Sequence, residues 1–187
     1  MAKARKKDTP TGLKVPPHNI EAEQAVLGGV LINNDALNQV MDLLSPGDFY
    51  REAHADLFEG MVSLYDISEP IDIITLSQVL NKKDRMEKVG GVDYLATLVQ
   101  SVATSAGIVF HAEIVRNLSV RRRLISQCST ISELCFQEQE DTASLLERAE
   151  QSIFDIAEGQ IREGFQSLKQ VITGSFKKLE RDRKSVV

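Results

Sequence analysis

The chain has 187 residues, of which 42% are hydrophobic, 26% charged and 5% aromatic, and it contains no tryptophan. The absence of any run of about 18 apolar residues argues against a membrane span, and the polar N-terminus argues against a secretory signal. The formal net charge is −5, and this acidic balance argues against a phosphate backbone as the main partner.

Residues 1–15 are predicted to form a disordered basic tail. They hold five Lys or Arg residues and one Asp, so the tail carries +4 and the rest of the chain −9. Such an arm can bind nucleic acid through phosphates. It has no aromatic side chain to stack a base, and a solvated tail is the simpler interpretation.

The stretch from Pro16 to Leu31 predicts a capped helix over residues 20–32. Asn19 suits the N-cap, and acidic residues follow it at the positive end of the helix dipole. Gly28 and Gly29 interrupt the apolar pattern, although each glycine costs roughly 1 kcal/mol against alanine in a helix interior. We interpret the pair as a place where another helix approaches closely.

Four more predicted helices complete a globular helical subdomain over residues 16–105. The first is short and bears Leu37, and the turn 45–48 separates it from a helix that ends before Glu69. Asp72 can cap the next helix, although the β-branched residues 71–75 could instead form a strand. Gly90 and Gly91 form a turn before the last of the four. The fold class is therefore all-α, with a compact helical bundle.

Residues 106–159 predict a projecting αα-hairpin that serves dimerisation. Its first helix begins at Ile108 and covers about 29 residues, and a second helix follows over 142–158. The first helix is apolar on two sides, so it needs cover on both. Packing against another copy supplies that cover. We predict that the self-association surface includes Leu118, Leu124, Ile131, Leu134, Leu146 and Ile153.

Residues 160–187 predict a linker followed by one more amphipathic helix, from about Phe165 to Arg183. Its apolar face includes Leu168, Ile172, Phe176 and Leu179.

Cys128 and Cys135 lie seven residues apart in the predicted long helix. That spacing separates them by about 10 Å along the helix axis, too far for a disulfide within one chain. We expect buried, reduced thiols and hence a cytoplasmic protein.

Residue patterns typical of catalysis are missing from the sequence. No G-x-x-x-x-G-K-[ST] loop is present to hold a nucleotide phosphate. The histidines His18, His54 and His111 have no second ligand at metal-binding spacing, so surface or packing roles are expected. The run Arg121–Arg123 is expected to point one side chain at a partner and two at water. We predict no catalytic residue, metal or cofactor in these residues.

Several separated motifs resemble the N-terminal domain and linker helix of bacterial DnaB-type replicative DNA helicases. Besides the opening helix, the resemblance rests on Asp48–His54 (DFYREAH), Glu69–Asp72 (EPID), Gly90–Leu95 (GGVDYL) and Val120–Ile125 (VRRRLI). These motifs cover residues 16 to about 184 in the order and spacing of the family.

The resemblance implies the N-terminal collar of a hexameric helicase, built as a trimer of dimers through the hairpins. It implies that the chain is a fragment that ends before an ATPase motor, which would use ATP and Mg²⁺ to unwind DNA while moving on single-stranded DNA. The linker helix would dock on a neighbouring motor through Leu168, Ile172, Phe176 and Leu179.

The resemblance also implies recruitment of primase, through the C-terminal domain of that partner. The matching primase-facing positions are Glu21, Tyr94, Ile125 and Ile131, although core packing is an equal alternative for the two isoleucines. A helicase loader is a further partner of this family.

Three other interpretations stay open on the sequence. The first is a stand-alone helical nucleic-acid-binding protein that uses the basic tail and the arginine run. The second is an enzyme with an unrecognised carboxylate site, and the third is the helicase-binding domain of a primase. Salt-dependent DNA binding that is lost on deletion of residues 1–15 would favour the first.

Overall fold

The computed structural model describes residues 15–137 and 141–158, and this part of the chain is helical without a strand. The all-α prediction is confirmed, and the strand considered for residues 71–75 is wrong because Ile73 begins a helix. The expected basic tail up to residue 14 and the expected linker helix, with Leu168, Ile172, Phe176 and Leu179, lie outside the described residues.

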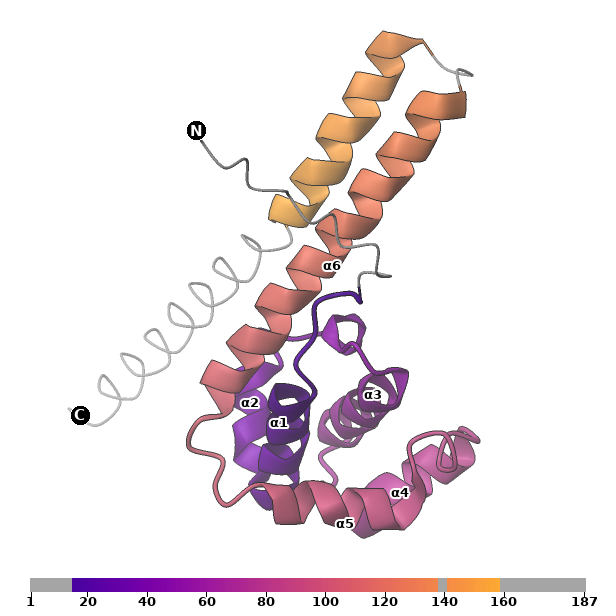
Figure 1. Cartoon of the computed structure of the whole chain (residues 1–187). Coiled ribbons are helices and arrows are strands. Elements are labelled where there is room, and N and C mark those ends of the chain that lie inside the picture. Colours follow the sequence, from indigo (N-terminus) through magenta and orange to yellow (C-terminus); the bar gives the residue numbers. More distant parts are fainter. Residues whose placement is uncertain (1–14, 138–140, 159–187) are drawn as a thin grey trace, which may run out of the picture.

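The helices follow one another with short connections (Figure 1). In chain order they are α1 (Ile20–Ile32), the 3-10 turn η1 (Asn34–Ala36), α2 (Leu37–Val40), the 3-10 turn η2 (Pro46–Asp48), α3 (Glu52–Asp66), α4 (Ile73–Lys82), α5 (Gly91–Ser101) and α6 (Ile108–Gln137). A further helix covers residues 142–158.

Local sequence signals set the helix starts. The side chain of Asn19 accepts a hydrogen bond from the N–H of Ala22 at 3.0 Å, as expected for an N-cap. The side chain of Asp72 accepts from the N–H groups of Ile74 and Thr75 at 2.8 Å each. Gly90, at φ 97°, has the left-handed conformation that glycine adopts without strain, and it precedes α5.

Helix α1 lies at the centre of the subdomain and packs against α5 and α6. The core consists of apolar side chains with almost no exposed surface. They include Val26, Leu27, Val30, Leu57, Phe58, Met61, Leu76, Leu80, Leu95, Leu98 and Ile108.

The glycine pair in α1 marks a close helix contact, as predicted. A Cβ atom on Gly28 would lie 2.4 Å from the carbonyl oxygen of Leu98 in α5, and one on Gly29 would lie 3.2 Å from Cδ1 of Ile108. The bare backbone of Gly28 therefore lets α5 approach α1 more closely than any side chain would allow.

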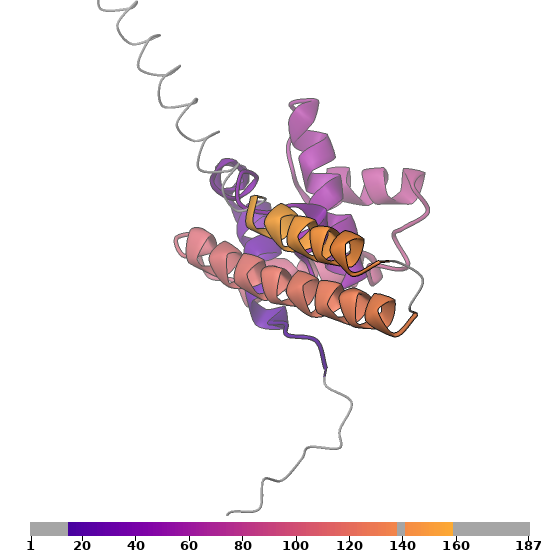
Figure 2. The same cartoon turned by 90° about the horizontal axis from the view of Figure 1, so that it is seen from above.

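Helix α6 belongs to two parts of the molecule. Its first half packs on α1 and α2, whereas its second half runs beside the helix 142–158 and projects from the subdomain as a hairpin (Figures 1 and 2). Within the described residues, none of the helices combines the length and the apolar character that crossing a membrane requires.

Candidate functional site

A buried polar network joins α1, α3 and α5. His54 is fully buried in α3; its Nδ1 lies 2.6 Å from Oε2 of Glu23, and its Nε2 lies 2.6 Å from the hydroxyl of Tyr94. The carboxylate of Glu23, itself buried, also accepts a hydrogen bond from the N–H of Tyr50 at 2.7 Å. These partners compensate a carboxylate that would otherwise be costly to bury.

The network reaches the surface at Tyr94, whose side chain is half-buried. Besides His54, the Tyr94 hydroxyl contacts Nε2 of Gln24 at 3.0 Å and a guanidinium nitrogen of Arg51 at 3.3 Å. The Arg51 guanidinium lies 5.6 Å from the centroid of the Tyr94 ring, within range of a cation–π interaction. Side chains from three helical segments therefore meet at one exposed point.

A second polar cluster joins η2 to the middle of α6. The buried carboxylate of Asp48 accepts hydrogen bonds from the Ser119 hydroxyl at 2.7 Å and from the N–H and hydroxyl of Ser45 at 2.8 Å each, and it pairs with Arg123. Burial alone would raise the pKa of Asp48, but these hydrogen bonds and the charge of Arg123 outweigh it and hold the pKa below its ordinary value.

Asp48 should therefore make the fold sensitive to acid. Because its pKa is lower in the folded chain than in the unfolded chain, its contribution is present above the unfolded pKa and is lost as pH falls through the folded one. We expect wild type to lose more of its free energy of unfolding than Asp48→Asn between about pH 5 and about pH 3. Urea denaturation at each pH measures this, and equal losses in the two proteins would contradict it.

Arg122 connects the residues before α1 to the start of the hairpin. Its guanidinium donates hydrogen bonds to the carbonyl oxygens of Pro17 at 2.9 Å and Asp48 at 2.5 Å. It also lies 5.7 Å from the ring centroid of Tyr50, which stacks on His18 with centroids 4.2 Å apart. These contacts fix the direction in which α6 leaves the subdomain.

The expectation for the arginine run holds for the exposure of its side chains but not for their partners. Arg121 and Arg123 are both exposed and Arg122 is half-buried, but Arg123 also pairs with Asp48 while Arg122 donates to backbone carbonyl oxygens of the subdomain. The reason is that the turn before α3 lies along α6, where two adjacent long side chains reach the same residue, Asp48. The run therefore offers less positive charge to an external phosphate than its sequence implies.

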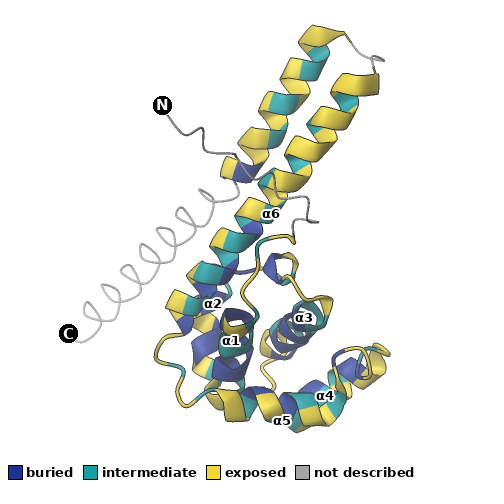
Figure 3. Cartoon of the chain, in the orientation of Figure 1, coloured by how far each residue is buried: buried dark blue, intermediate teal, exposed yellow. Residues whose placement is uncertain are grey.

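The hairpin leaves much apolar surface uncovered within one copy of the chain (Figure 3). Of the six predicted self-association residues, Leu146 is 60% exposed and Ile153 is 43% exposed. The other four, Leu118, Leu124, Ile131 and Leu134, are half-buried. Phe136 and Phe154, which the prediction did not include, are also exposed.

Cys128 and Cys135 are exposed and free, so the expected burial of both thiols is wrong. Both lie on the projecting part of α6, where the subdomain no longer covers the helix. The prediction that they form no disulfide with each other is confirmed.

The four predicted primase-facing residues fall in two regions. Glu21 is exposed on α1, one turn before the Gln24 that binds Tyr94, so these residues share one face of α1 and α5. Ile125, which is 53% exposed, and the half-buried Ile131 lie on the projecting part of α6.

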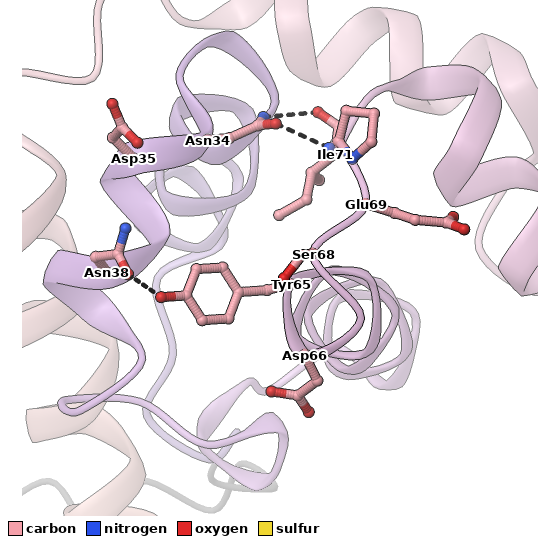
Figure 4. A pocket seen from close by; sticks show the side chains of 9 residues that line it. Asn34, Asp35, Asn38, Tyr65, Asp66, Ser68, Glu69 and Ile71 are labelled. Atoms are coloured by element: carbon pink, nitrogen blue, oxygen red, sulfur yellow. Dashed lines mark hydrogen bonds between the residues drawn. The ribbon is translucent and has the colours of Figure 1, made fainter.

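A hollow of about 670 Å³ lies between α2 and the loop after α3 (Figure 4). Asn34 lines the hollow; its side-chain amide accepts a hydrogen bond from the N–H of Ile71 at 2.8 Å and donates one to the carbonyl oxygen of Ile71 at 2.7 Å. The carboxylates of Asp35, Asp66 and Glu69 point in different directions. The described residues contain no group of three His, Cys, Asp or Glu side chains placed to hold a metal.

Two residues of the buried network were missed from the sequence, Glu23 and His54. A signal was available, because Glu23 shares one helix face with Val26 and Leu27, and His54 shares one with Leu57 and Phe58. Apolar helix faces turn toward the core, so an acid on one such face and a histidine on another indicate a buried pair.

The family model of the DnaB-like helicase N terminal domain matches residues 15–117 of the chain. The chain is 37% identical over 168 residues to the replicative DNA helicase DnaC of Bacillus subtilis. That match covers 90% of the chain and 37% of the relative, so the chain spans little more than a third of that protein.

Solved structures show the same fold. The N-terminal domain of DnaB helicase from Mycobacterium tuberculosis matches with a TM-score of 0.73 at 36% identity, covering 75% of this chain and 99% of that one. The corresponding domain from Helicobacter pylori, described together with its interactions with primase, matches with a TM-score of 0.52 at 26% identity, over 62% of this chain and 90% of that one.

Proposed function

Because this chain belongs to the family of DnaB-like helicase N-terminal domains, we propose that it forms the collar of a hexameric replicative helicase. In this role residues 16–105 are the globular part, residues 106–159 pair copies into dimers, and three dimers complete the ring. The remainder of the whole protein would carry the ATP- and Mg²⁺-dependent motor, act on single-stranded DNA and interact with a loader.

The observation that carries this proposal is the apolar surface of the hairpin. Leu146, Ile153 and Phe154 are each more than two-fifths exposed, and they lie on the helix 142–158, which projects from the subdomain beside α6. An exposed apolar surface of this kind is typical of a protein–protein interface. A second hairpin presents the same surface and so can cover it symmetrically.

Leu146→Asp should shift the chain toward smaller species. Leu146 is largely exposed in one copy, so the substitution removes little internal packing but places a charge in the proposed contact, where it is costly to desolvate. Light scattering after size-exclusion chromatography measures the mass. Gln151→Glu, at an exposed position on the other side of the same helix from Leu146, is the control and should leave the mass unchanged; equal masses for all three proteins would remove Leu146 from the interface.

We propose further that the face around Glu21 and Tyr94 receives the C-terminal domain of primase, and that Ile125 and Ile131 take part. The support is the similarity to a domain whose structure is described with its interactions with primase, together with the polar group of half-buried Tyr94 and exposed Arg51. Titration calorimetry of that primase domain into the full chain tests the proposal. Saturable binding is expected, and the absence of binding at concentrations that detect millimolar affinity would contradict it.

A further inference from the structure

We propose that Arg51 binds a carboxylate of the protein that docks on the Tyr94 face, and that the buried network exists in part to hold Arg51 in place. This inference rests on the proposed docking of primase at that face and adds to it one recognition residue and the chemistry that the residue accepts.

The hydrogen bonds at the Tyr94 hydroxyl determine the direction of donation through the network. A phenol oxygen accepts about two hydrogen bonds and donates one. Gln24 and Arg51 both donate to this oxygen, at 3.0 and 3.3 Å. The Tyr94 hydrogen is therefore left for Nε2 of His54, 2.6 Å away, and Nδ1–H of His54 donates to Glu23. Each donor has one acceptor, so the phenol oxygen is fixed as an acceptor toward Arg51.

Arg51 is held at two points and still has free donors. Its guanidinium lies over the Tyr94 ring and gives one N–H to the Tyr94 hydroxyl, which leaves the other N–H groups of its fork unused by these contacts. Its side chain is exposed, and among the described residues no carboxylate pairs with it, in contrast to Arg85 and Arg123. A fixed, unpaired arginine loses little side-chain entropy when it binds a carboxylate.

The surroundings favour a protein carboxylate over a nucleic-acid phosphate. The ring of Tyr94 is covered on one face by Arg51 and packs through its Cβ and Cγ near Gly90, so it is poorly placed to stack a base. The exposed acidic residues Glu52, adjacent in sequence, and Glu21, on the same face of α1, would repel a phosphate backbone. A single acidic side chain meets less of this repulsion than a run of phosphates does.

The test is titration calorimetry of the primase C-terminal domain into the full chain and its variants. We expect Arg51→Ala to raise Kd by about tenfold or more, because it leaves the partner carboxylate without its counter-charge. The Kd of Arg51→Lys should lie between those of wild type and Arg51→Ala, since lysine keeps the charge but lacks the planar fork of the guanidinium. Lys82→Ala, which removes an exposed charge at the end of α4, is the control and should leave Kd within about twofold.

Salt dependence separates recognition from a purely structural role. Binding by wild type should weaken with added salt, and the slope should be shallower for Arg51→Ala, because one charge pair is gone. Unfolding midpoints should agree between Arg51→Lys and wild type. Equal Kd values and equal salt slopes for Arg51→Ala and Lys82→Ala would overturn the inference while docking stands. No binding by wild type would instead overturn the docking proposal and the Arg51 inference with it.

Discussion

Gly28→Ala should lower the free energy of unfolding by about 2 kcal/mol or more. The new Cβ atom would lie 2.4 Å from the carbonyl oxygen of Leu98 and 2.8 Å from Cγ2 of Val102. The Leu98 oxygen is backbone, so α1 and α5 must separate to relieve the clash. The gain of roughly 1 kcal/mol in helix propensity offsets only part of this loss. Urea denaturation followed by circular dichroism at a fixed protein concentration measures the change.

The neighbouring Gly29 is the matched control. Its added Cβ would meet Cδ1 of Ile108 at 3.2 Å, the end of a side chain that can move by a few tenths of an ångström. The helix-propensity gain and the small repacking loss then nearly cancel, so Gly29→Ala should change stability by less than about 1 kcal/mol. Equal effects at the two positions would show that the close approach at Gly28 does not decide the packing of α1 on α5.

Glu23→Ala should lower the free energy of unfolding by about 3 kcal/mol. The substitution removes the acceptor for Nδ1 of fully buried His54 and for the N–H of Tyr50, and it leaves both donors without a partner in the core. It also removes the group that orients the His54 ring toward Tyr94, which weakens the polar contact between α3 and α5. The same denaturation measurement detects the loss.

Glu21→Ala controls for the helix dipole, because Glu21 lies in the same first turn of α1 but is exposed. Its loss should change stability by no more than about 0.5 kcal/mol. If Glu23→Ala were as mild as Glu21→Ala, the buried network would contribute little to the fold.

The helices were predictable because each carries its own local signal. Asn19 and Asp72 are N-cap residues, Gly28 interrupts an apolar face, and the residues from Ile108 keep a helical period for thirty positions. These features depend on neighbours within a few residues. The boundaries of α1 and the start of α6 could therefore be predicted without knowledge of the tertiary structure.

The polar contacts between helices could not be predicted in the same way. Asp48 meets Ser119 across 71 residues of chain, and His54 meets Tyr94 across 40. Asp48, Ser119 and Tyr94 each have the pattern of an ordinary surface or turn residue, and the apolar face around His54 does not say which residue it meets. Only the packing of α3, α5 and α6 on α1 brings these residues together. The predicted burial of the two cysteines was wrong for the same reason. The point at which the subdomain stops covering α6 depends on how the other helices pack, and the sequence of α6 does not contain it.

The central proposal, that the hairpin joins copies of this chain, is tested most directly by sedimentation equilibrium of the full chain over a hundredfold range of concentration. The chain has a mass of 20.8 kDa. The proposal predicts a mass that rises with concentration to at least twice that value. A mass that stays at that of one chain at the highest concentration would contradict it.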